Sequence, residues 1–289
     1  MKSLISYLQE AANTKAAIGH FNISDLAGLR AIFESARTLN LPIVIGVSEG
    51  EREFVGVKTA ASLIKSLREE YNYPIFLNAD HTHSFEKIKQ AVEAGFDAVL
   101  FDGGKLSLEE NIKQTKEVVE YVKSKNPNIL VEGEMGYIGS SSIIFKELPK
   151  GAAIEDKDLT KPEDAKRFVE ETGVDLFSPA VGNIHGMFAG APNPNLKIDL
   201  IKEIKDAVKI PLVLHGGSGT RDSDFLEAIS AGINMIHINT EIRVGWRHGI
   251  DMALKNNPEE VVPYKILSVA LDEIKTIVYN RLKLFNRIK

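Results

Sequence analysis

The sequence contains no cysteine, which excludes disulfide bonds, thiolate metal ligands and a cysteine nucleophile. Positive charge is not in excess, because 35 lysine and arginine residues face 40 aspartate and glutamate residues and leave a net charge of -5. Such a chain has no overall basic field to hold a nucleic-acid backbone, so we expect no nucleic-acid partner. No apolar run reaches the ~18 residues that a membrane-spanning helix needs, and we expect no membrane association.

The remaining composition is that of a folded globular protein. Hydrophobic residues make up 44% of the chain and charged residues 26%, which argues against a disordered or fibrous protein. The first fifteen residues carry Glu10 and lack an apolar core, so we expect no signal peptide and a cytoplasmic location. No linker rich in proline or glycine divides the 289 residues, and we predict a single domain over residues 1–289.

Short apolar runs alternate with amphipathic stretches along the whole chain. The runs lack strict alternation, which is typical of parallel strands buried on both faces. Several of the amphipathic stretches end at a glycine, a common helix stop. Eight nearly even units predict a (β/α)8 (TIM) barrel, and an open, doubly wound sheet is the alternative. The predicted strands are residues 16–22, 42–48, 74–80, 97–102, 128–134, 174–181, 210–216 and 234–239, and the predicted helices include 24–39, 84–95, 107–124, 162–173 and 222–232.

Two segments exceed what an ordinary barrel of about 250 residues needs. Residues 137–160 form a long loop after the fifth strand, and a loop of this length predicts a functional lid. Residues 258–289 predict extra C-terminal helices, with Pro258 and Pro263 as breaks.

Histidines collect where the predicted strands end. In a barrel of this kind catalytic residues lie at the C-terminal ends of the strands. His81, His185 and His215 follow or end the third, sixth and seventh strands, so they are expected to face a common centre. Three neutral imidazoles with an open position are a catalytic zinc pattern, although other divalent metals also suit such a site. We interpret His20 and His248 as structural, and His83 as an outer or packing residue.

Carboxylates end three of the predicted strands, the third, the fourth and the fifth. Asp80 directly precedes His81, and in a regular strand the two side chains would point to opposite faces. A break at the strand end would bring both to the site, where Asp80 is a candidate for proton transfer. Asp102 and Glu134 are candidates for partners of the metal ligands or for a second metal position. A salt bridge or a helix cap is the alternative for each.

The last two loops have the character of an anion site. Gly216, Gly217 and Ser218 precede one predicted helix, and Asn239 and Thr240 precede the next. Backbone amides at helix N-termini bind anions, and the loops after strands seven and eight commonly hold phosphate in barrels. The alternative is a tight turn that requires glycine.

These residues lie in motifs that resemble the class II, metal-dependent ketose-bisphosphate aldolases, the family of fructose- and tagatose-bisphosphate aldolases. The resemblance runs from GHFNISD and PIVIGVSEG through NADHTHSF and VEGEMG to GNIHGMF, LVLHGGSG and INTE. It implies zinc held by His81, His185 and His215, with Asp80 as the acid/base residue and a displaced metal position at Asp102 and Glu134. It also implies that the ketose phosphate is lined by Gly186, Gly216, Gly217, Ser218, Asn239 and Thr240, with Asn22 and Ser48 near the phosphate.

The resemblance implies reversible aldol cleavage of a ketose bisphosphate. Fructose 1,6-bisphosphate is the expected substrate, with dihydroxyacetone phosphate and glyceraldehyde 3-phosphate as products. Homo-oligomers (dimer or tetramer) and a monovalent cation beside the zinc are also implied. A Schiff-base aldolase is the rival mechanism, but the sixth predicted strand carries no lysine and Lys105 is expected to be solvated.

The chain departs from the family pattern in four places. The acidic lid motif is replaced by GYIGSSSIIF, so Glu147, Glu155 and Asp156 become candidates for its carboxylate. Asp102 is followed by Gly103, Gly104 and Lys105 where serine and histidine are usual. His237 stands where an asparagine usually contacts the substrate, and we count it among the substrate-binding residues. Ala189 replaces a basic residue. Two alternatives therefore stay open: a divergent enzyme for another phosphorylated sugar, or a non-catalytic relative that binds metal and sugar phosphate.

Overall fold

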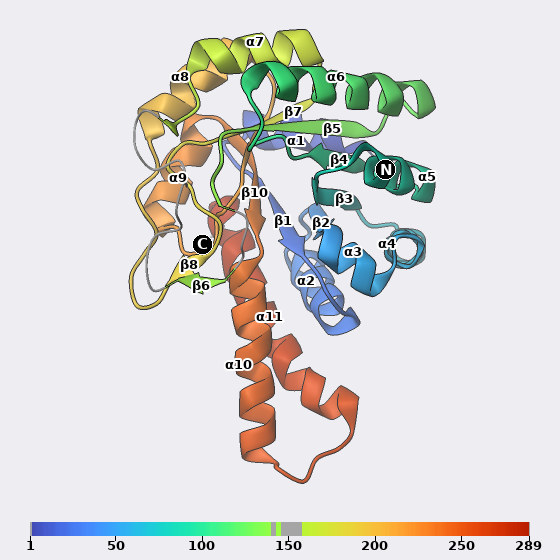
Figure 1. The fold of residues 1–289 in the computed structure, drawn as a ribbon. Coiled ribbons are helices and arrows are strands. Elements are labelled where there is room, and N and C mark those ends of the chain that lie inside the picture. The colour runs from blue at the N-terminus through green and yellow to red at the C-terminus, as the bar shows by residue number, and fades with distance from the viewer. Residues whose placement is uncertain (1, 140–142, 146–157, 289) are drawn as a thin grey trace.

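The computed structural model describes residues 2–139, 143–145 and 158–288. Its centre is a closed barrel of parallel strands in the order β1-β10-β9-β7-β5-β4-β3-β2 (Figure 1). The predicted (β/α)8 barrel is therefore confirmed, and the open sheet is wrong. The barrel strands are β1 (Ile18–Asn22), β2 (Ile43–Val47), β3 (Ile75–Thr82), β4 (Ala98–Phe101), β5 (Leu130–Met135), β7 (Leu176–Pro179), β9 (Leu212–Leu214) and β10 (Ile233–Ile238).

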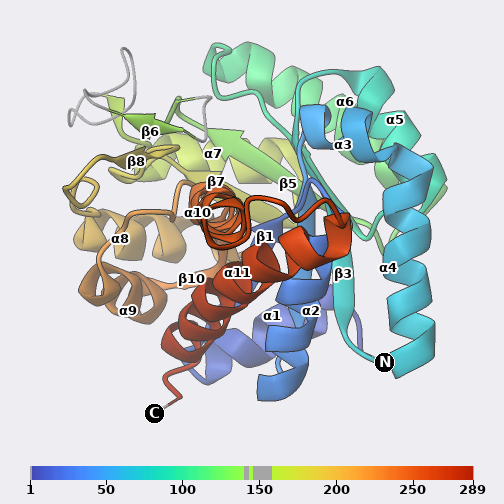
Figure 2. The ribbon, with the colours of Figure 1, turned by 90° about the horizontal axis from the view of Figure 1, so that it is seen from below.

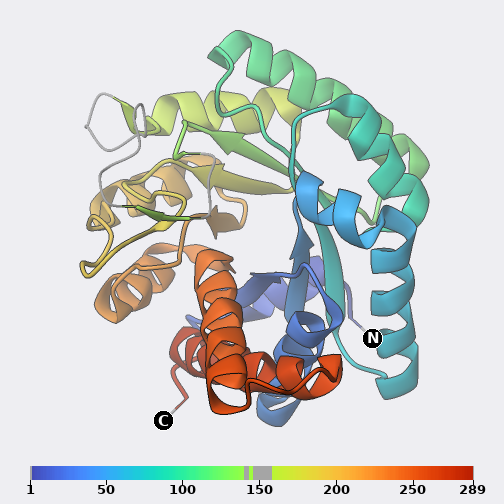
Figure 3. The same ribbon diagram turned by 60° about the horizontal axis from the view of Figure 1, so that its bottom comes forward.

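Helices surround the barrel, as Figures 2 and 3 show. Local signals place their ends: Asp25, Ser84 and Ser107 cap three helix N-termini with their side chains. Gly95 and Gly173 end α5 and α7 in the left-handed conformation, as the glycine stops predict. The helices are α1 (Leu4–Asn13), α2 (Leu26–Leu39), α3 (Glu49–Val55), α4 (Val57–Tyr71), α5 (Phe85–Ala94), α6 (Leu108–Lys125), α7 (Pro162–Thr172), α8 (Ile198–Val208), α9 (Asp222–Ala231), α10 (Thr240–Asn256) and α11 (Pro263–Phe285).

One apolar cluster fills the interior of the barrel at the N-terminal ends of the strands. Every barrel strand contributes one buried side chain to it, and α1 adds two more. Each fully buried leucine, isoleucine, valine, phenylalanine or methionine side chain stabilises the fold by roughly 1.5–3 kcal/mol. This layer closes the barrel below the polar residues of the site. Its members are Leu4, Leu8, Ile18, Val44, Phe76, Ala98, Leu130, Leu176, Val213 and Met235.

Three features differ from the predicted elements. Helix α1 was not predicted, and two short parallel strands, β6 (Ile144–Phe145) and β8 (Met187–Phe188), pair outside the barrel. Residues 258–289 were predicted to hold several helices. The tail instead forms the single helix α11, which begins at Pro263 and packs on α10 and α2. In Figure 1, α10 and α11 extend together away from the barrel.

The predicted lid, residues 137–160, lies largely outside the described residues. Within the described residues no helix is both long enough and apolar enough to cross a membrane.

Candidate active site

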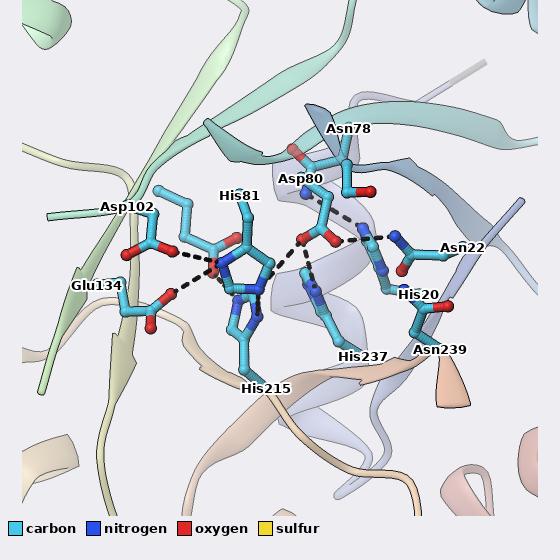
Figure 4. Close-up of polar contacts among 12 residues, drawn as sticks. His20, Asn22, Asn78, Asp80, His81, Asp102, Glu134, His215, His237 and Asn239 are labelled. Carbon is cyan, nitrogen blue, oxygen red and sulfur yellow. Dashed lines mark hydrogen bonds and ion pairs between the residues drawn. The ribbon is translucent and has the colours of Figure 1, made fainter. Parts of the chain in front are cut away.

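A break at the end of β3 places Asp80 and His81 on the same side of the strand. The register between β3 and β4 shifts between Ala79 and Thr82, and His81 has a φ angle of 35°, in the left-handed region. A residue other than glycine adopts this conformation only at a cost, and strand bulges of this kind re-aim side chains. Because of the break, the side chains of Asp80 and His81 both turn into the barrel (Figure 4). In a regular strand they would point to opposite faces.

A buried arginine holds this break in place. Arg52 of α3 is 3% exposed, and its Nη1 atom donates to the backbone oxygens of Val47 and Asp80 at 2.6 and 3.1 Å. Its Nη2 atom donates to Thr82 Oγ1 at 2.8 Å. The guanidinium therefore joins α3, β2 and the irregular end of β3, and fixes the backbone on both sides of His81.

The three predicted metal histidines meet at the rim. One ligand nitrogen from each of His81, His185 and His215 lies within 4.8 Å of the others. His81 Nε2 is 3.0 Å from His215 Nδ1, and His185 Nε2 is buried without a hydrogen-bond partner in the described part of the chain. Three converging imidazole nitrogens, one of them otherwise unsatisfied, fit a divalent metal.

Carboxylates contact the outer nitrogens of two of these rings. Asp102 Oδ2 lies 2.8 Å and Glu134 Oε2 3.5 Å from His81 Nδ1. On the other ring, Glu132 Oε1 lies 2.7 Å from His215 Nε2, a contact that sequence analysis missed. Metal-binding histidines usually donate their second N–H to a carboxylate, which fixes the ring and its tautomer. These carboxylate contacts therefore suit a metal ion held by the inner nitrogens of His81 and His215. His81, Asp102 and Glu134 also form a second group within 4.8 Å, in line with the predicted alternative position.

Burial and close charges perturb the titration of this group. Burial alone would lower the pKa of His81, but Asp80, Glu134 and Asp102 outweigh it and raise the pKa well above its usual range. Burial, with Asp102 nearby, raises the pKa of Glu134 well above that of an ordinary glutamate. The pKa of His185 is lowered by burial and by the other two histidines. One proton is thus favoured on His81, while His185 stays neutral, the form that binds a metal.

Asp80 lies beside this histidine group and is buried. Its burial raises the pKa, but His81 and His237 outweigh that effect and hold the pKa well below the usual value. Oδ2 accepts a hydrogen bond from Asn22 Nδ2 at 2.8 Å, and Oδ1 lies 3.3 Å from His237 Nδ1. The low pKa favours the ionised carboxylate, which is able to accept a proton.

A second buried carboxylate, Glu51 of α3, was not predicted. Its two oxygens accept hydrogen bonds from Asn22 at 2.8 Å, from the Ser48 backbone at 2.7 Å and from Arg243 at 2.8 Å. Asn239 donates to it at 3.4 Å. Glu51 thus links three of the predicted phosphate-side residues, which lie on three separate segments. The spacing of Ser48 and Glu51 is that of a helix capping box, which predicts the contact with Ser48 alone, because the other partners are distant along the chain.

A cavity of about 330 Å³ opens over the histidines and Asp80. Arg243, in the first turn of α10, contributes the one arginine or lysine side chain among the described residues that line it. Of the predicted residues, Asn22, Ser48, Asp80, His81, Asp102, His185, His215, His237 and Asn239 line the cavity; Glu134, Gly186, Gly216, Gly217, Ser218 and Thr240 do not. Glu49, Gly50, His83, Gly139 and Arg243 line it without having been predicted as site residues.

The glycines of the predicted phosphate loops are required by close backbone contacts. Gly216 has a φ angle of 62°, and a Cβ atom there would lie 2.3 Å from the Ile184 carbonyl oxygen. Gly186 has a φ of 94°, and its Cβ would meet Phe145 at 2.1 Å. Ser218 is buried, and its hydroxyl accepts a hydrogen bond from the Glu241 backbone. Gly216 therefore agrees with the alternative interpretation, in which a tight turn requires glycine.

The remaining histidines and lysine are placed as follows. His83 has an exposed side chain, so the packing alternative is wrong, and its Nδ1 atom lies 3.3 Å from the Asp102 backbone oxygen, in line with the outer position that was the other alternative. His248 lies on the surface beside Glu273, as expected of a structural residue. Lys105 is exposed, with its ammonium over the Tyr137 ring. The lid candidates Glu147, Glu155 and Asp156 lie outside the described residues.

A closed parallel barrel with three converging histidines at the C-terminal ends of its strands is typical of the metal-dependent enzymes with a barrel fold. The family model for class II fructose-bisphosphate aldolase matches residues 2–289. The chain is 34% identical over 286 residues to a fructose-bisphosphate aldolase of Geobacillus stearothermophilus, covering 98% of this chain and 96% of the relative. It is 34% identical over 293 residues to one of Staphylococcus aureus, covering 99% of both chains.

A solved structure agrees with these matches. The YdjI aldolase of Escherichia coli superposes with a TM-score of 0.81 at 28% identity, covering 99% of this chain and 97% of that one. The chain therefore belongs to the class II fructose-bisphosphate aldolase family, a metal-dependent family of lyases that act on sugar phosphates.

Proposed function

We propose that this chain is a zinc-dependent aldolase that cleaves fructose 1,6-bisphosphate into dihydroxyacetone phosphate and glyceraldehyde 3-phosphate. One observation carries the proposal: the ionised, buried Asp80 lies beside three converging histidine nitrogens at the floor of one cavity. A metal bound by His81, His185 and His215 would supply Lewis acidity for the carbonyl and hydroxyl oxygens of the ketose.

In the cleavage direction, Asp80 takes the proton of the C4 hydroxyl as the C3–C4 bond breaks. The C4 fragment leaves as the aldehyde, and the electron pair of the broken bond stays on C3 of the ketone fragment. In condensation, Asp80 returns the same proton to the new hydroxyl. Asn22, which donates to Asp80 Oδ2, keeps the carboxylate in one orientation during both steps. The candidates for proton transfer at C3, Glu147, Glu155 and Asp156, lie outside the described residues.

Arg243 and the amide of Asn239 supply the polar groups for a phosphate at one wall of the cavity. Arg243 is anchored at 2.8 Å by Glu51, whose burial keeps the guanidinium close to the cavity. A guanidinium pairs with phosphate through charge-assisted hydrogen bonds. The proposed sugar-phosphate substrate would therefore meet a cation at its phosphate and the histidine group at its reacting carbons.

The test is a coupled assay of purified, zinc-loaded protein with fructose 1,6-bisphosphate, in which triose phosphate release is read as NADH oxidation. We expect cleavage that a chelator abolishes and that Asp80→Asn reduces by at least about 100-fold. Asp251→Asn is the matched control, because this carboxylate is exposed and pairs only with Arg247 among the contacts described. Stoichiometric zinc without turnover on a panel of ketose phosphates would contradict the proposal and favour a sugar-phosphate-binding protein.

We also propose a homo-oligomer, dimer or tetramer. Support comes from the helix pair α10 and α11, which extends from the barrel and carries Val261 at 82% and Tyr264 at 73% exposed at its tip (Figure 1). Light scattering coupled to size exclusion measures the mass directly. A monomer at micromolar concentration would overturn this part of the proposal.

A further inference from the structure

Two histidines form a parallel stack inside the barrel, one layer below the rim. His20 of β1 and His237 of β10 are opposite each other in the strand register. Their ring centroids are 3.4 Å apart, and their planes differ by 1°. Both side chains are buried, and Figure 4 shows them beneath Asp80.

The barrel leaves specific room for the His20 ring. A Cβ atom at Gly46 of β2 would lie 2.1 Å from His20 Cε1, so any larger residue at position 46 would displace the imidazole. On the other side, Asn78 Nδ2 lies 3.2 Å from His20 Nε2 and donates to it. Gly46 and Asn78 together hold His20 in one orientation.

The stack is not a second metal site, although His20, Asp80 and His237 each present a ligand atom within 4.8 Å of the others. The lone pair of an imidazole nitrogen lies in the plane of its ring. Two stacked, nearly parallel rings whose centroids are 3.4 Å apart cannot both have one ion in their planes, so they cannot share a metal in good geometry.

The geometry instead directs His237 toward Asp80. His237 lies between two rings, with His20 on one side and His215 at 3.9 Å on the other. In this position its Nδ1 atom is 3.3 Å from Asp80 Oδ1. A neutral imidazole carries one N–H, and only a proton on Nδ1 makes this contact attractive toward an ionised carboxylate.

We propose that His20 is a positioning residue: by stacking on His237 it holds His237 Nδ1–H against Asp80, so that both carboxylate oxygens are fixed. His237 then restrains Oδ1, as Asn22 restrains Oδ2 at 2.8 Å. Both nitrogens of His237 are buried without a full hydrogen bond among the described residues, and the 3.3 Å approach of Nδ1 to Asp80 Oδ1 is the polar contact through which the ring acts on Asp80. The kinetic part of this inference rests on the proposed aldolase function, in which Asp80 moves the proton.

Removal of the stack should affect turnover more than substrate binding. Without His20, the His237 ring has space to tilt and Asp80 loses its restraint at Oδ1. We expect His20→Ala to lower kcat about 10- to 100-fold, within the range that outer partners of a catalytic group contribute. KM should change less than about twofold, because His20 does not line the cavity. His20→Phe, which keeps a flat ring against His237, should recover most of kcat, and the surface variant His248→Ala should match the wild type.

Nitrogen-15 NMR of histidine-labelled, zinc-loaded protein supplies a readout that is independent of activity. The chain has only seven histidines, so His237 is assigned by comparison with a His237→Asn sample. In the wild type we expect the His237 proton on Nδ1, and in His20→Ala a mixture of tautomers or exchange broadening. A wild-type kcat in folded His20→Ala, an equally low kcat in folded His20→Phe, or a wild-type His237 protonated on Nε2 would each overturn the proposal.

The two hypotheses fail in different ways. If the wild-type protein cleaves no ketose bisphosphate, the aldolase function fails, while the tautomer of His237 still tests the stack. If the wild type is active and His20→Ala leaves both kcat and the His237 signals unchanged, the positioning role fails alone. Should His20→Ala not fold, the wild-type tautomer and the kcat of His20→Phe decide the question.

Discussion

Nε2 of His81 lies 3.0 Å from Nδ1 of His215, and each ring has its other nitrogen on a carboxylate. Both outer nitrogens donate to their carboxylates, so the two inner nitrogens would face each other with lone pairs if both rings were neutral. A shared proton or a shared cation removes this repulsion. The raised pKa of His81 favours the shared proton in the metal-free chain, and favours its location on His81.

Metal binding should therefore release a proton even at neutral pH. We expect zinc titration of metal-free protein at pH 7.5 to release about one proton per ion. Because the pKa of His81 is raised, zinc affinity should fall about tenfold for each pH unit below that pKa. Calorimetry in two buffers of different ionisation enthalpy measures the proton count. Zero proton release would contradict the assignment of the proton to His81.

Glu132 should tune metal affinity through His215. Glu132→Gln keeps the size of the side chain but removes the charge that faces His215 Nε2 at 2.7 Å. We expect zinc affinity to fall about 10- to 100-fold, measured by competition with a fluorescent chelator. Glu273→Gln is the matched control, because Glu273 contacts His248 at the surface. Equal affinity in both variants would remove Glu132 from the metal site.

Arg243 should affect substrate binding through its charge. Arg243→Met removes the one arginine or lysine among the described residues that line the cavity. The lost charge-assisted hydrogen bonds are worth about 1.5–3 kcal/mol, so KM for the bisphosphate should rise about 10- to 100-fold. Arg247→Met, one turn further along α10 and exposed, should leave KM unchanged. A fall in kcat at constant KM would argue against phosphate binding by Arg243.

Arg52 should matter for both folding and metal binding. Arg52→Met leaves the backbone oxygens of Val47 and Asp80 without their buried donor. We expect a loss of about 1–3 kcal/mol in unfolding free energy for each unpaired acceptor, together with weaker zinc binding as His81 relaxes. Urea denaturation measures the first and a zinc titration the second. Arg30→Met, at an exposed ion pair, should change stability by less than about 0.5 kcal/mol.

His20 should make stability depend on pH. Burial lowers its pKa to about 3, against about 6.5 in the unfolded chain, so between these values the unfolded state binds more protons. The contribution of neutral His20 is complete above pH 6.5 and is lost as the pH falls toward 3, by up to about 1.4 kcal/mol per unit. Urea denaturation of metal-free wild type and His20→Phe between pH 7 and 4 should show a shallower loss in the variant. Parallel pH curves would contradict a buried neutral His20.

Sequence periodicity predicted the barrel because parallel strands buried on both faces leave short apolar runs that helices separate. Strand ends then predicted the rim, and His81, His185 and His215 meet there as expected. The alternation rule also indicated that Asp80 and His81 needed a break between them. The direction of that break depends on Arg52, whose three partners lie on two other elements, so local pattern could not supply it.

The unpredicted features depend on contacts between distant segments. His20 and His237 become neighbours only because β1 and β10 close the barrel, and each alone reads as an ordinary core histidine. Glu51 accepts hydrogen bonds from residues 22, 48, 239 and 243, and no motif near residue 51 predicts this set of partners. Neither the His20–His237 stack nor the full set of Glu51 contacts can be predicted from a short stretch of sequence, because both form when the sheet closes.

The apolar layer built from all eight barrel strands and α1 seals one end of the chamber in which the polar residues lie. Among the described residues this layer leaves the rim as the open end of the chamber, and reactant and product would use the same route in opposite directions. A ligand at the rim would also isolate the buried histidines from bulk solvent. Exchange of their ring protons should then slow when substrate binds, although no residue of the lower layer touches it.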